Sequence, residues 1–95
     1  MDQTILLTVL YDFYKELLTS TQRSYFEDYY FSNLTLSEMA ENYNVSRNAI
    51  SKQLKQVAIK LEDYESKLQL KNKRETILKI CENNKELQEQ IDNIL

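Results

Sequence analysis

Glycine, proline, histidine and tryptophan are all absent from this chain of 95 residues, and cysteine occurs only once. Without glycine there is no glycine-rich loop to cradle a phosphate, and the tight turns of β-hairpins are disfavoured. Turns must be made by asparagine, serine, threonine and aspartate, which cap helices and tolerate unusual backbone angles. The composition therefore favours helices joined by short polar loops.

The same absences exclude several kinds of functional site. With Cys81 alone and no histidine, the chain can form neither an internal disulfide nor a zinc site of the usual Cys/His type. There is also no nucleophile motif of the kind found in hydrolases. We therefore expect a protein that is not an enzyme and that uses no metal or cofactor.

Neighbouring acids do not change this expectation. Asp12 with Glu16, and Glu27 with Asp28, are paired acids that could form a catalytic dyad, but on exposed helix faces such pairs are ordinarily solvated. The N-terminal region has no basic run, and the apolar stretch from Ile5 to Tyr11 is too short to cross a bilayer. We expect a soluble cytoplasmic protein without membrane insertion.

Positive charge is concentrated in one segment of an acidic chain, whose net charge is −3. Residues 1–44 hold two basic and seven acidic groups, and residues 61–95 hold six basic and eight acidic groups. Residues 45–60 hold four basic groups and no acid; these are Arg47, Lys52, Lys55 and Lys60. Phosphate contacts require local rather than global positive charge, so this segment is the candidate for binding nucleic acid.

Apolar spacing predicts four helices in the first 70 residues. The first covers about residues 4–18, and the second runs from about 20 to 31 after Thr19 and Gln22, which form a capping box. Thr35 and Glu38 form another capping box and open a short third helix. Ser46 caps the fourth helix, which continues past residue 61; its inner face carries Ile50, Leu54, Val57 and Leu61.

The third and fourth helices fit the pattern of a helix-turn-helix. Ala40 provides the small residue where the two helices cross, and Ile50 provides the buried anchor after the turn. Asn44 occupies the turn position that needs a positive φ angle, where glycine is usual. Apolar residues flank the turn at Met39, Tyr43 and Val45.

The fourth helix presents a polar face that suits nucleic acid. Lysine and arginine bind phosphates, whereas asparagine, glutamine and serine can contact base edges. The dipole of a helix favours acidic residues in its first turn, so Arg47 is electrostatically unfavourable there. Contact with a negatively charged ligand would account for its presence. The alternative is an ordinary solvated face. The predicted nucleic-acid-binding residues are Arg47, Asn48, Ser51, Lys52, Lys55 and Gln56.

These features together resemble a known family. The segments that carry the resemblance are Asp12-Phe13-Tyr14, Leu17-Leu18-Thr19, Gln22-Arg23, Tyr29-Tyr30, the sequence LSEMA at 36–40, and Val45-Ser46-Arg47. Over roughly residues 5–70 the chain resembles the YlxM family of DNA-binding-type proteins, and its turn region resembles region four of bacterial sigma factors. The resemblance implies a link to the signal recognition particle pathway, through that particle's GTPase or its RNA. It leaves open a nucleic-acid-binding regulator or a protein-interaction accessory factor.

The fold expected is all-α: a helical bundle containing a helix-turn-helix core over residues 1–70, with a C-terminal amphipathic helical extension over 71–95. Asn72 is a candidate break before the extension. Beyond it, apolar residues recur at heptad spacing, with Asn84 at the one polar site; they are Ile77, Ile80, Leu87, Ile91 and Ile94. Such a stripe packs either on its own domain or against a second chain.

The first helix is apolar on more than one side, which predicts burial on several sides. Ile5, Val9 and Phe13 form one row, while Leu7, Leu10, Tyr14 and Leu18 spread around it. We therefore expect a homodimer whose interface includes Ile5, Val9 and Phe13, with the monomer as the alternative.

Overall fold

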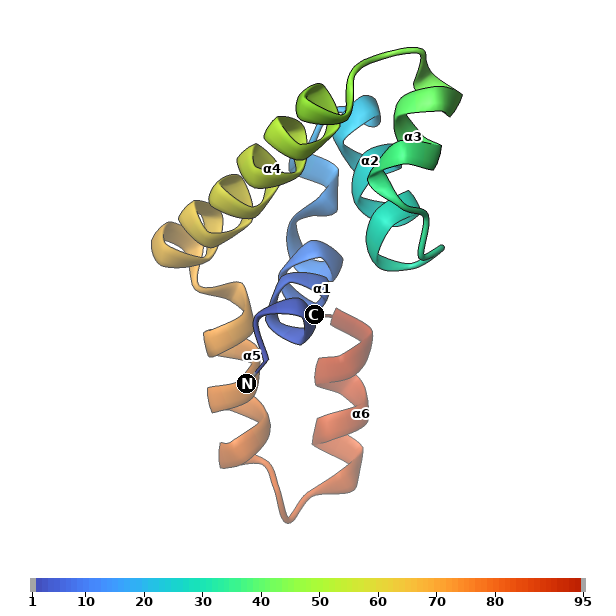
Figure 1. The fold of residues 1–95 in the computed structure, drawn as a ribbon. Coiled ribbons are helices and arrows are strands. Elements are labelled where there is room, and N and C mark those ends of the chain that lie inside the picture. Colours follow the sequence, from blue (N-terminus) through green and yellow to red (C-terminus); the bar gives the residue numbers. More distant parts are fainter. Residues whose placement is uncertain (1, 95) are drawn as a thin grey trace.

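The computed structural model describes residues 2–94, and all of the regular structure in that range is helical (Figure 1). This confirms the all-α prediction. The elements are α1 (Gln3–Tyr14) with a 3₁₀ turn at Lys15–Leu17, α2 (Ser20–Tyr30), α3 (Leu36–Tyr43), α4 (Arg47–Leu68), α5 (Leu70–Ile80) and α6 (Lys85–Ile94).

The long helix α4 organises the core, because it packs against α1, α2 and α3 (Figure 1). Near its start, Ile50 and Leu54 join Tyr25 of α2 and Met39 of α3 in one buried cluster. Further along, Val57 and Leu61 complete a second cluster with the buried residues of α1 and with Phe26. The predicted inner face of α4 is thus confirmed at all four positions.

The structure buries a different side of α1 from the row that the sequence analysis singled out, which consists of Ile5, Val9 and Phe13. The structure buries Leu7, Leu10, Tyr11 and Tyr14, whereas Ile5 is 53% and Leu17 is 51% exposed. The apolar surface of this helix is broad enough that spacing alone does not select a side. The contacts of α1 with α4 and with Phe26 of α2 make that selection, and Leu17 lies in the 3₁₀ turn that follows the helix.

The C-terminal region is a hairpin of two helices and not one continuous helix (Figure 1). Asn72 lies inside α5, so the predicted break at this residue is wrong; α4 ends instead at Leu68, and the break falls at Gln69, which has φ 52°. Asn84 is not a polar position in a heptad core. Its Oδ1 accepts a hydrogen bond from the backbone N–H of Leu87 at 3.1 Å and so caps α6.

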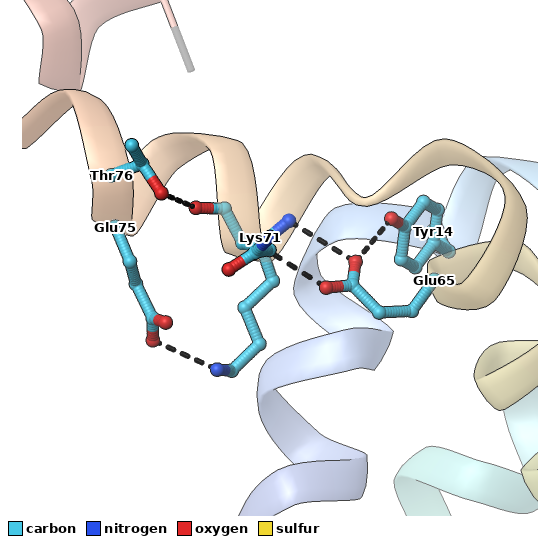
Figure 2. A network of polar contacts seen from close by, with 6 residues as sticks. Tyr14, Glu65, Lys71, Glu75 and Thr76 are labelled. Atoms are coloured by element: carbon cyan, nitrogen blue, oxygen red, sulfur yellow. Dashed lines mark hydrogen bonds and ion pairs between the residues drawn. The ribbon is translucent and has the colours of Figure 1, made fainter.

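A polar network fixes the corner between α4 and α5 (Figure 2). The Glu65 carboxylate accepts hydrogen bonds from the backbone N–H groups of Lys71 at 3.1 Å and Asn72 at 3.2 Å. The Tyr14 hydroxyl donates to Glu65 at 2.5 Å and accepts from the N–H of Leu70 at 2.9 Å. These bonds satisfy the first N–H groups of α5, which no cap of its own satisfies. Tyr14 thereby joins α1 to the base of the hairpin.

Candidate nucleic-acid interface

The turn between α3 and α4 has the geometry that its sequence predicts. Asn44 adopts the left-handed conformation, with φ 54° and ψ 47°. Its neighbour Val45 donates its N–H to the carbonyl of Ala40 at 3.0 Å, which closes the end of α3. Ser46 Oγ accepts from the N–H of Ala49 at 3.0 Å and begins α4. Both helix starts are therefore set locally, since Thr35 and Glu38 also form the predicted capping box.

Helices α3 and α4 are held together by a buried apolar contact beneath the turn. Met39 and Ile50 are both fully buried, and Ala40 is half-buried against the same cluster. The Tyr43 hydroxyl donates to the Asp28 carboxylate on α2, and this bond is the main reason that the pKa of Tyr43 rises to about 12. The helix-turn-helix is thus fixed to α2 as well as to itself.

The predicted interface residues lie together over three turns of α4. Ser51 is half-buried, and the other five are exposed; these are Arg47, Asn48, Lys52, Lys55 and Gln56. Among residues 2–94, no carboxylate pairs with any of the three cations on this face. In contrast, Lys67 lies 2.9 Å from Asp63 near the far end of the helix. The positive charge at the start of α4 is therefore available to a ligand.

Lys60 does not belong to this face, although it is the fourth cation of the basic segment. Its Nζ donates to Gln22 Oε1 at 3.2 Å, and its side chain lies half-buried against α2. The same Gln22 oxygen accepts the N–H of Thr19 in the predicted capping box. Position 60 is about 130° away from the centre of the predicted face in helical rotation, which explains the difference. Three cations remain for phosphates.

The structure also reveals two neighbours that the list of predicted residues omits. A shallow hollow at the start of α4 is lined by Leu36 and Ser46 together with the predicted residues Arg47, Asn48 and Ser51. The capping box at Thr35 signalled where α3 begins, but not that its first turn would lie beside the first turn of α4. A ligand on this face would meet both helix starts.

The paired acids act as structural partners. Glu27 accepts a hydrogen bond from the Tyr11 hydroxyl, and Glu16 lies 3.6 Å from Arg23. Burial of the Tyr11 hydroxyl, followed by its bond to Glu27, raises the pKa of Tyr11 to about 12.

Within the described range, no three His, Cys, Asp or Glu side chains gather in a way that could hold a metal. None of the helices there is both long enough and apolar enough to span a membrane.

Comparison with known proteins agrees with this architecture. A UPF0122 protein of Shouchella clausii is 43% identical over 76 residues, which cover 80% of this chain and 70% of the relative. A UPF0122 protein of Oceanobacillus iheyensis is 43% identical over 82 residues, covering 86% of this chain and 78% of the relative. The matching family is described as "Putative helix-turn-helix protein, YlxM / p13 like", and its profile matches residues 1–94. The chain therefore belongs to the UPF0122 family, as its resemblance to YlxM proteins implied.

Proposed function

We propose that this protein binds nucleic acid through the first three turns of α4 and acts as a cytoplasmic regulatory protein. The observation that carries the proposal is the face formed by Arg47, Lys52 and Lys55, which is exposed and has no carboxylate partner within residues 2–94. It lies on the second helix of a helix-turn-helix, the element that enters the major groove of DNA in this motif. Asn48, Ser51 and Gln56 supply groups for base edges.

The number of cations fixes the expected salt dependence. Three phosphate contacts give a slope of about −2.7 in a plot of log affinity against log salt concentration for duplex DNA. A fourth contact would be needed for a slope of about −3.6, but Lys60 is bonded to Gln22.

A double substitution tests the proposal. Lys52→Glu with Lys55→Glu should weaken duplex binding by at least tenfold at low salt, because two contacts are lost and two like charges are added. The matched control is Lys73→Glu with Lys79→Glu, which changes the net charge equally on exposed residues of α5. Fluorescence anisotropy with a labelled duplex measures both. Equal loss in the two variants, or unchanged affinity in the first, contradicts the proposal.

The second candidate function is that of a protein-interaction accessory factor in the signal recognition particle pathway. Membership of the YlxM-like family favours it, as do the large apolar side chains that the α5–α6 hairpin exposes, with Ile80 at 78% and Ile94 at 80%. The test is whether this protein still co-purifies with the particle's GTPase after nuclease treatment, which this function predicts. Loss of co-purification on nuclease treatment would mean that any association runs through RNA, and so would favour the first proposal.

A further inference from the structure

Three adjoining hollows form one groove beside the proposed interface. The first lies between the end of α2, the loop before α3 and Thr4 of α1. The second lies between α2 and α4 and shares Tyr29, Tyr30 and Leu36 with the first. The third is the hollow at the start of α4, which shares Leu36 and Ser51 with the second. We call this continuous feature the tyrosine groove. It leads from Arg47 and Lys55 of α4 to Tyr29, which is exposed, and Tyr30, which is half-buried.

The chemistry of the tyrosine groove is that of a polyanion site. No aspartate or glutamate lines any of its three parts, although acids outnumber basic residues in the chain. Its two cations are Arg47 at one end and Lys55 in the middle. Much of the remaining lining consists of hydroxyl and amide groups, which can donate to and accept from bases and sugars.

Tyr29 provides an aromatic surface in this groove. Tyr29 is 37% exposed to solvent. Its ring meets that of Tyr30 at 83° with centroids 5.0 Å apart. An edge-to-face contact covers at most one face of either ring, so Tyr30 leaves a face of Tyr29 uncovered. Unlike the hydroxyls of Tyr11 and Tyr14, the Tyr29 hydroxyl makes no hydrogen bond within residues 2–94.

We propose that the tyrosine groove binds unpaired nucleotides, with a base stacked on Tyr29 and the strand's phosphates held by Arg47 and Lys55. A partly exposed aromatic ring beside cations is an arrangement by which proteins bind single strands. The inference rests on the proposed function, because the groove is continuous with the face of α4 that would bind the duplex.

The test compares two substitutions at one position. Tyr29→Leu removes the aromatic face, whereas Tyr29→Phe keeps it and removes only the hydroxyl. Anisotropy is measured at low salt with a labelled 12-nucleotide single strand, as DNA and as RNA, and with a duplex of the same sequence. We expect Tyr29→Leu to weaken single-strand binding roughly 5- to 150-fold, the loss typical of one stacked base. Tyr29→Phe should bind like the wild type, and neither change should alter duplex binding.

Lys52→Glu provides the complementary variant, because Lys52 lies on the exposed face of α4 but does not line the groove. It should weaken duplex binding more than single-strand binding. Thermal melts by circular dichroism confirm that each variant is folded.

The outcomes separate the two proposals. Duplex binding without single-strand binding, or single-strand binding that Tyr29→Leu does not weaken, overturns the inference and leaves the proposed function intact. Equal losses for the Leu and Phe variants overturn stacking as the mode of binding. If no nucleic acid binds at low salt, both proposals fail.

Discussion

The helix crossing depends on the size of one side chain. Ala40 lies half-buried against Met39 and Ile50, and its carbonyl accepts the N–H of Val45. Ala40→Leu would insert extra carbon atoms between two packed helices, which typically costs about 1–3 kcal/mol. We expect a lower melting temperature in circular dichroism. Ser37→Leu is the control, since it makes an apolar side chain at an exposed position of the same helix. A melt unaffected by Ala40→Leu would contradict the register of the crossing.

Single residues also show where local sequence is sufficient. Asn44 takes the positive φ predicted for it, because asparagine reaches the left-handed region more readily than most residues. Gln69 also has a positive φ, yet glutamine gives no such signal. The N–H groups that follow it are held partly by a residue distant in sequence: Leu70 donates to the Tyr14 hydroxyl, 56 residues away, and Lys71 donates to Glu65.

Among the helices, the starts of α2, α3 and α4 were predictable because each cap involves residues three apart. The division into α5 and α6 was not predictable, because a heptad pattern does not distinguish one helix from a hairpin of two. The exposed polar face of α4 was predictable, since the buried positions fix the opposite side. The tyrosine groove was not, because it brings together residues from four helices.

The corner between α4 and α5 gives a prediction for individual amides. In Tyr14→Phe the N–H of Leu70 loses its acceptor, while Lys71 and Asn72 keep theirs on Glu65. Amide hydrogen exchange should therefore accelerate most at Leu70. In Glu65→Ala it should accelerate at Lys71 and Asn72. Uniform exchange across the hairpin in both variants would mean that the network does not fix the corner.

The same network sets a direction for pH dependence. Burial, followed by the hydrogen bond to Glu65, raises the pKa of Tyr14 to about 12. Because the pKa is raised above its unfolded value of 10, the stabilisation is complete below pH 10 and is lost as the pH rises toward 12. Urea unfolding should show a falling free energy of unfolding across that window, and Tyr14→Phe should make the decline shallower. A decline of the same steepness in the variant would exclude Tyr14 as a cause.

At the scale of the whole molecule, the distribution of apolar surface points to self-association. The chain measures 51 × 24 × 24 Å, and the structure gives neither α5 nor α6 a fully buried residue. Beside the hairpin, Val9 and Phe13 line a hollow with Asp12 of α1 and Arg74 of α5. The row predicted to form a dimer interface is thus only partly covered: Ile5 is 53% exposed, whereas Val9 and Phe13 are half-buried beside α5. Apolar surface arranged in this way is typical of a site covered by a partner.

We therefore propose a homodimer in which Ile5, Val9 and Phe13 contact a second copy. Two copies would present two α4 helices, as helix-turn-helix proteins do on paired half-sites. Light scattering at micromolar concentration should give twice the monomer mass of 11.4 kDa. Val9→Asp with Phe13→Asp should give monomers, because two buried charges without partners oppose association.

Two controls locate the interface of that dimer. Ile59→Asp alters a side chain that is 65% exposed on α4, away from the predicted row, and should leave the dimer intact. Ile80→Asp with Ile94→Asp removes the most exposed apolar side chains of the hairpin. If this pair dissociates the dimer while the α1 pair does not, the hairpin is the interface and the assignment to α1 is wrong. A mass of 11.4 kDa for the unaltered chain would refute the dimer itself, and the hairpin's apolar side chains would then be left for a different protein to cover.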